Sequence, residues 1–222
     1  MQFSTGLIVS CQAYEGEPLF GAHIMAAMAK AAEEGGAIAI RANTPADIAA
    51  IRKVTTLPII GLYKIHSTAS DVYITPHRAS AEAIARAGCD VIAIDATPRR
   101  RHNDETLQDL IPFIRDRLGK PVMADCSCIE DAQLAAALGA DCLGTTLAGY
   151  TAHGRPMTAG PDLAFVQQLV AQFTLPIIAE GRFGLPEQAA QALLLGAHAV
   201  CVGGAITRPQ DITRRFVAAI QK

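Results

Sequence analysis

The chain has 222 residues, of which half are apolar and 18% are charged, and its formal net charge is −2. This length and apolar content suit one large domain, residues 1–222, with a well-filled core. The near-neutral charge lacks the basic surface that would attract nucleic acid or an anionic membrane. Arg99-Arg100-Arg101 is the one basic cluster in the sequence, and we expect it to form a solvated loop or a local anion contact.

The sequence also predicts a reduced, cytoplasmic protein. No apolar stretch approaches the roughly 20 residues that a spanning helix needs. The first 17 residues lack the basic start and the long apolar run of a signal peptide. The cysteines are scattered, without CxxC or paired metal spacing, and most lie in apolar runs where a free thiol acts as a small hydrophobe. They are Cys11, Cys89, Cys126, Cys128, Cys142 and Cys201.

Short β-branched runs recur along the chain and predict strands. Their apolarity is nearly continuous rather than alternating, which is typical of parallel strands covered on both faces. The predicted strands are residues 6–12, 36–42, 58–64, 90–96, 121–127, 141–146, 176–181 and 198–204.

Amphipathic, Ala-rich segments lie between these runs and predict helices. Several end in glycine, and Thr44-Pro45 and Gly160-Pro161-Asp162 combine a cap residue with an early proline. The predicted helices are residues 21–36, 44–54, 78–88, 104–119, 128–139, 161–173, 185–196 and 210–221.

Eight strands, each followed by a helix, predict a single (β/α)₈ TIM barrel of the α/β class. A doubly wound open sheet is the alternative. It would normally have fewer strands and a glycine fingerprint after the first one, which the sequence "SCQAYEGEP" does not supply.

In such a barrel the chemistry lies at the carboxyl ends of the strands. We therefore expect the polar residues at the predicted strand ends to converge on one cavity. They are Gln12, Arg41, Lys64, Asp95, Asp125, Thr145, Glu180 and the pair Gly203-Gly204.

Lys64 and Glu180 end strands that are four positions apart in the ring, so they should face each other across the mouth. Two proton-handling groups on opposite sides of a small substrate suit inversion at a carbon centre. Structural ion pairing of each charge is the alternative.

The end of the last strand favours a phosphate site. Gly203-Gly204 allow close backbone approach, Arg208 follows, and Gly181-Arg182 come from the preceding strand. Barrels often bind phosphate with the loops after strands 7 and 8. A tight turn alone would also explain the glycine pair.

The histidines give no metal signal. His66, His77, His102 and His153 are expected on the surface, and no His/Asp/Glu set has local metal-ligand spacing. We therefore expect no metal, although one assembled from distant strand ends stays open. Asp95 either orients substrate hydroxyls or holds the loop 97–104.

Taken together, these residues resemble the N-acetylmannosamine-6-phosphate 2-epimerases of bacterial sialic-acid and amino-sugar breakdown. The resemblance extends over nearly the whole chain, in matching order and spacing. Its motifs are "LIVSCQA", "GEPL", "GGAIAIRA", "LPIIGLYK", "VYITP", "VIAIDAT", "MADCS", "GYT", "IIAEGR" and "VGGAITRP".

The resemblance implies roles for particular residues. Lys64 in "GLYK" and Glu180 in "AEGR" match the catalytic lysine and glutamate. Substrate-binding positions are matched by Gln12, Arg41 and Asp125, and the phosphate end by Gly181, Gly203, Gly204 and Arg208. The chain departs from the family pattern at "KIHS" and "DATPRRRHND", in the loops after the third and fourth predicted strands.

The implied reaction interconverts N-acetylmannosamine 6-phosphate and N-acetylglucosamine 6-phosphate. The ring opens, a base removes the C2 proton, and donors such as Arg41 stabilise the enolate. The proton returns to the other face, either from the same base acting on a reoriented intermediate or from a second, opposed base. No cofactor is required, because there is no net redox change. The expected partner is a small amino-sugar phosphate, with neither nucleic acid nor membrane, and barrels of this size often form homodimers.

Three alternatives remain from the residues alone. Lys64 could form a Schiff base in an aldolase-like lyase. A sugar-phosphate sensor on the same fold would need no catalysis, but it would be expected to lose charged strand ends that this chain retains. A ribulose-phosphate-type epimerase would require metal-binding His/Asp pairs at strand ends, where this chain lacks histidine.

Overall fold

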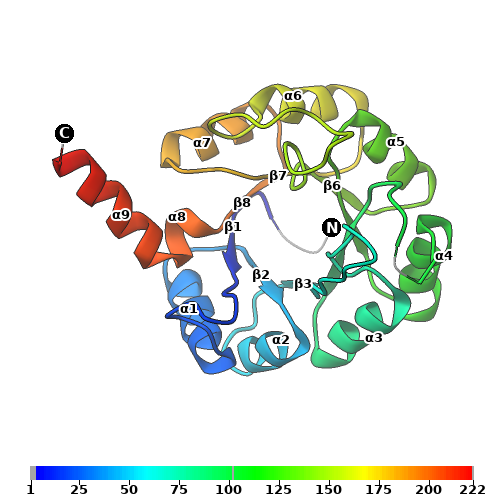
Figure 1. The fold of residues 1–222 in the computed structure, drawn as a ribbon, viewed down its shortest axis with the longest axis horizontal. Helices are drawn as coiled ribbons and strands as arrows, with labels where there is room; N and C mark the ends of the chain where they lie inside the picture. Colours follow the sequence, from blue (N-terminus) through cyan, green and yellow to red (C-terminus); the bar gives the residue numbers. More distant parts are fainter. Residues whose placement is uncertain (1–3, 102, 222) are drawn as a thin grey trace.

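The computed structural model describes residues 4–101 and 103–221, so His102 lies outside the described residues. All eight predicted strands form, and they close into a parallel barrel in which β8 pairs with β1 (Figure 1). The (β/α)₈ prediction is therefore confirmed. The strands are β1 (Gly6–Cys11), β2 (Ala39–Asn43), β3 (Ile59–Leu62), β4 (Val91–Asp95), β5 (Val122–Asp125), β6 (Cys142–Gly144), β7 (Ile177–Glu180) and β8 (Ala199–Val202).

The helices surround the barrel where the sequence predicts them, with one addition after β8. They are α1 (Ala22–Glu34), α2 (Pro45–Arg52), α3 (Arg78–Ala87), α4 (Leu107–Pro112), the π-helical turn η1 (Phe113–Arg117), α5 (Ile129–Ala137), α6 (Leu163–Gln172), α7 (Pro186–Leu194), the short α8 (Gly204–Thr207) and α9 (Pro209–Ile220). Within the described part of the chain, no helix combines the length and apolarity needed to cross a membrane.

The predicted helix starts are confirmed by their capping bonds. The Thr44 side chain accepts from the Asp47 N–H at 3.2 Å, and Pro45 occupies the first turn of α2. At α6, the Asp162 side chain accepts from the Phe165 N–H at 3.0 Å. These caps satisfy backbone donors that a helix leaves free at its start.

Strand alternation directs polar residues into the barrel. Ala39, Ile60 and Leu62 belong to the buried cluster that fills its interior. Successive side chains on a strand point to opposite faces. Arg41, two residues after Ala39, and Lys64, two residues after Leu62, therefore follow the inner face towards the carboxyl-terminal mouth.

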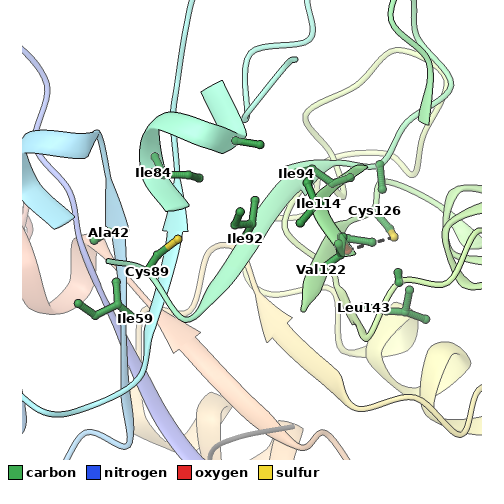
Figure 2. Packing of buried hydrophobic residues seen from close by; sticks show 14 of the residues in the cluster. Ala42, Ile59, Ile84, Cys89, Ile92, Ile94, Ile114, Val122, Cys126 and Leu143 are labelled. Carbon is green, nitrogen blue, oxygen red and sulfur yellow. Dashed lines mark hydrogen bonds between the residues drawn. The ribbon is translucent and has the colours of Figure 1, made fainter. Parts of the chain in front are cut away.

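The outer faces of the strands pack against the helices (Figure 2). Ile59 and Ile92 lie in one buried cluster with Ile84 of α3 and with Cys89. Cys89 packs directly on β3, because a Cβ added at Gly61 would lie only 2.6 Å from the Cys89 Cβ. Glycine at this position permits the close approach.

The loop after β4 differs from the expected solvated basic loop, and that expectation is wrong for two of its three arginines. Asp95 is fully buried and accepts from Arg99 Nη2 at 2.7 Å. Arg101 is 2% exposed and donates to the Asp95 carbonyl oxygen. Burial raises the pKa of Asp95. Of the two roles considered for Asp95, the structure shows that of holding the loop.

The final helix, α9, is exposed along its length, because the described residues of the barrel do not bury it. None of the α9 residues is buried, and α9 projects away from the ring of helices (Figure 1). Phe216 and Ile220, one turn apart, are 69% and 81% exposed. An apolar helix face of this kind is typical of a surface that a partner covers.

Candidate active site

A cavity of about 580 Å³ lies at the barrel mouth and collects most of the predicted site residues. The sequence-predicted residues that line it are Gln12, Arg41, Lys64, Glu180, Gly181, Arg182, Gly203, Gly204 and Arg208. Asp125 is fully buried behind the residues that line the cavity and does not line it itself. Lys64 and Glu180 therefore share one hollow, as their strand positions predicted.

Arg41 is the centre of a buried charge network. It is 1% exposed and forms a bidentate pair with Asp125, with Nη1–Oδ1 at 3.0 Å and Nη2–Oδ2 at 2.5 Å. Its Nη1 also donates to Glu180 Oε2 at 2.6 Å. Burial alone would lower the pKa of Arg41, but the two carboxylates outweigh it and raise the pKa.

Glu180 is the carboxylate of this network that lines the cavity. Its side chain is 14% exposed. Burial raises the pKa of Glu180 above the ordinary range, and the opposing effect of Arg41 does not cancel the increase. A carboxyl group with a raised pKa can both accept and donate a proton nearer to neutral pH.

Thr146 completes the network, and sequence reasoning missed it. Its hydroxyl lies 2.6 Å from Asp125 Oδ1 and 3.2 Å from Glu180 Oε2. The predicted residue, Thr145, instead binds the β7 backbone, since its hydroxyl accepts from the Glu180 N–H at 2.9 Å. The strand β6 ends at Gly144, earlier than predicted, and Thr146 rather than Thr145 lines the cavity.

Lys64 reaches the cavity from just beyond β3. Its backbone N–H donates to Asn43 Oδ1 at 2.9 Å, which fixes the chain where the strand has ended. Its Nζ donates to the Tyr14 hydroxyl at 2.8 Å and lies 4.9 Å from the centre of the Tyr14 ring. Tyr14 was not predicted, because nothing in its loop position marks it beyond the nearby Gln12.

The Tyr14 loop also reaches the predicted phosphate end. The Arg208 guanidinium lies 5.2 Å from the Tyr14 ring centre and 3.3 Å from Glu17 Oε1. The Tyr14 N–H donates to Glu17 Oε2 at 2.8 Å. One loop after β1 therefore contacts both the amine and the arginine that approach the cavity.

Arg182 lines the cavity, but its guanidinium is directed to the loop after β6. It donates to Ala148 O at 2.6 Å, to Gly160 O at 3.0 Å and to Thr158 Oγ1 at 3.1 Å. Its backbone adopts the left-handed φ of 58°, which is uncommon for a residue other than glycine. The structure shows a loop-holding residue, and the phosphate contact of Arg182 stays a prediction.

Gln12 presents an unused acceptor at the cavity. Its Nε2 donates to Ser10 Oγ at 2.8 Å. Its Oε1 is buried and has no hydrogen-bond partner among the described residues. Because buried polar atoms are nearly always hydrogen-bonded, an N–H or O–H group of a ligand is a fitting partner.

Side chains of the types that can bind a metal gather at one place outside this cavity. Cys128, Asp131 and His153 form the one group of three such residues found within residues 4–101 and 103–221. None of them lines the cavity. The cavity itself offers an amine, a carboxyl group and arginines, which suit proton transfer and anion binding.

The chain is similar in sequence to proteins that share one description. A family model described as "Putative N-acetylmannosamine-6-phosphate epimerase" matches residues 25–222. A protein of Clostridioides difficile strain 630 named "Putative N-acetylmannosamine-6-phosphate 2-epimerase" is 47% identical, over 97% of this chain and 96% of its own. A protein of the same name from Thermosynechococcus vestitus is 51% identical, over 99% of this chain and 95% of its own.

A solved structure is similar as well. Its title describes the N-acetylmannosamine-6-phosphate 2-epimerase from Clostridium perfringens. It superimposes with a TM-score of 0.93 at 45% identity, covering 96% of this chain and 92% of that one.

The buried network predicts a large stability loss when Asp125 is removed. Asp125→Ala leaves the buried Arg41 charge with a single carboxylate, and breaking a buried pair typically costs about 3–5 kcal/mol. We expect urea unfolding to report a loss of this size in the free energy of unfolding.

Glu82→Ala is the matched control, because Glu82 pairs with Arg86 at an exposed site on α3, where an ion pair contributes little to stability. Equal, small losses in the two variants would contradict the importance of the buried network.

Proposed function

The chain belongs to the N-acetylmannosamine-6-phosphate 2-epimerase family and is an isomerase, and we propose that it interconverts N-acetylmannosamine 6-phosphate and N-acetylglucosamine 6-phosphate without a metal or an organic cofactor. One observation supports this most directly. The Lys64 amine and the Glu180 carboxyl group line the same cavity, and cationic Arg208 lines it too.

The phosphate end anchors the substrate. Arg208 supplies the charge, and the backbone at Gly181, Gly203 and Gly204 permits close approach. In the free protein Arg208 pairs with Glu17, so the substrate phosphate replaces a carboxylate as its partner. Binding a remote, non-reacting group in this way favours correct orientation at the reacting carbon.

Proton transfer at C2 requires an open-chain sugar. The C2 hydrogen is acidic only when C1 is an aldehyde, so the ring opens before a base acts. We assign C2 proton transfer to Lys64, whose amine the Tyr14 hydroxyl holds at the cavity wall. Glu180, whose pKa is raised, assists ring opening, proton return or both.

The enolate formed at C1–C2 is stabilised by positive charge. Arg41 lines the cavity, and its Nε has no hydrogen-bond partner among the described residues. Asp125 acts through Arg41, which it holds by two hydrogen bonds. The free Gln12 Oε1 is an acceptor for an N–H or O–H group of the sugar. Because epimerisation leaves the oxidation state unchanged, the reaction needs no redox cofactor.

We also propose that the protein is a cytoplasmic homodimer. All six cysteines are free, as expected in a reducing compartment. The exposed apolar face of α9 supports association, because Phe216, Val217 and Ile220 lack cover from the described residues of the barrel. A symmetric pair would bury the same face of each copy.

Proton NMR of N-acetylmannosamine 6-phosphate in D₂O, with chelator-treated protein, tests the proposed reaction. We expect N-acetylglucosamine 6-phosphate to appear with deuterium at C2. Lys64→Met should slow C2 exchange by roughly 10²- to 10⁴-fold, the usual range for general acid–base catalysis. Lys53→Met removes an exposed lysine outside the cavity and should leave the rate unchanged.

Three outcomes would each overturn part of this proposal. Wild-type protein that binds the sugar phosphate without C2 exchange would refute the epimerase chemistry. Normal deuterium washout from either epimer by Lys64→Met would refute the assignment of Lys64. Activity that is lost on chelation and restored by a metal would refute metal independence.

Sedimentation at micromolar concentration tests the dimer. Phe216→Asp places a charge on the apolar face of α9 and should convert the dimer to a monomer. Ala218→Asp adds the same charge on the opposite side of the helix and should leave the dimer intact. A monomeric wild type, or a Phe216→Asp variant that remains dimeric, would contradict the proposed interface.

A further inference from the structure

The residues Cys128, Asp131 and His153 bring three different donor atoms together on the carboxyl-terminal side of the barrel. Cys128 is the N-cap residue of α5, and Asp131 lies in the first turn of that helix. His153 comes from the loop after β6, 22 residues beyond Asp131. One thiol sulfur, one carboxylate oxygen and one imidazole nitrogen all lie within 4.8 Å of one another.

Asp131 is oriented as metal-ligating carboxylates are. It is 1% exposed, and its Oδ2 accepts from the Ser127 N–H at 2.9 Å and the Ser127 hydroxyl at 2.6 Å. Its other oxygen, Oδ1, faces His153 Nε2 at 3.4 Å. Among residues 4–101 and 103–221, no lysine or arginine pairs with this buried carboxylate. Outer hydrogen bonds that fix one ligand oxygen are a usual part of metal sites.

We propose that these three side chains bind a zinc ion. Sulfur, nitrogen and oxygen donors together suit Zn²⁺, which is borderline-soft and accepts all three. In a tetrahedral zinc site with ordinary bond lengths, ligand atoms lie roughly 3.3–3.8 Å apart. The 3.4 Å between His153 and Asp131 already fits. Cys128 is only partly buried, so its side chain can turn inward, and water fills the fourth position.

A nucleophilic serine is the competing interpretation of this cluster, because the Ser127 hydroxyl also lies 3.2 Å from His153 Nε2. Ser127 is fully buried, and its hydroxyl donates to Asp131 rather than to the imidazole. It therefore cannot reach a substrate, and its proton is directed to Asp131 rather than to the imidazole. Ser127 fits the role of an outer partner that orients Asp131.

Zinc at this position would join the start of α5 to the loop after β6. That loop contains Tyr150, which lines the cavity and lies against Arg182 at 5.2 Å from the ring centre. None of the three ligands lines the cavity, so the zinc site stands or falls separately from the proposed epimerase chemistry.

Zinc titration of untagged, chelator-treated protein against a chromogenic chelator tests the site. We expect one zinc per chain and a higher melting temperature in the wild type. Cys128→Ser and His153→Ala should each weaken zinc binding by well over tenfold, since losing even an outer-shell partner costs roughly 10- to 100-fold in affinity. His23→Ala removes an exposed histidine elsewhere and should bind zinc as the wild type does.

Cobalt(II) provides an independent readout of the thiolate. The wild type should show a sulfur-to-cobalt charge-transfer band that Cys128→Ser lacks, and circular dichroism should show both variants folded. Absence of stoichiometric zinc binding would overturn the proposal. Equal zinc affinity in the wild type, Cys128→Ser and His153→Ala would also overturn it, by showing adventitious surface binding only.

Discussion

A single buried guanidinium, that of Arg41, determines how the mouth of this barrel is organised. It extends from β2 to Asp125 on β5 and to Glu180 on β7, so one side chain connects strands on different sides of the ring. Two carboxylates next to each other in a buried site repel, and Arg41 compensates both. Without it, the charges at these strand ends would be costly to bury. With it, Glu180 is held at the cavity wall, where burial raises the pKa of Glu180 despite the opposing effect of Arg41.

In the same arrangement, the residues that hold other side chains in place differ from those proposed to act on the substrate. Asp125 is fully buried and Thr146 lies between the two carboxylates, so both act by holding Arg41 and Glu180 in place. Lys64 approaches from outside this network and contacts Tyr14 instead. Among residues 4–101 and 103–221, no carboxylate forms an ion pair with Lys64, the group proposed to act at C2. The proposed phosphate end, at Arg208, is tied to the same loop through Glu17.

Much of this architecture could be predicted from the sequence. Eight continuous apolar runs imply parallel strands, and strand alternation places Gln12, Arg41, Lys64 and Glu180 at one mouth. The predictions that failed concern residues whose positions are set by contacts with segments far apart in the sequence. Thr145 was predicted in place of Thr146, because the end of β6 is set by pairing with its neighbours and not by its own residues. Arg101 was expected in solvent, but it fills a buried position beside the β4 carbonyl.

Tyr14 and the Cys128, Asp131 and His153 cluster lay beyond sequence reasoning for a related reason. Each joins loops that are close only after the barrel closes, so no local spacing marks them. Strand order and the resemblance to the epimerase family both pointed to Lys64 and Glu180 as the proposed catalytic pair, whereas only the folded structure identifies Tyr14.

The most direct test of the central claim is a pH titration of the Glu180 side-chain carboxyl by carbon-13 NMR, with the resonance assigned by its loss in Glu180→Gln. If burial outweighs the attraction of Arg41, the midpoint lies above the ordinary glutamate pKa of about 4.3. A midpoint at or below that value would show that the ion pair dominates, and it would contradict the proposed role of Glu180 as a group that gives and takes a proton.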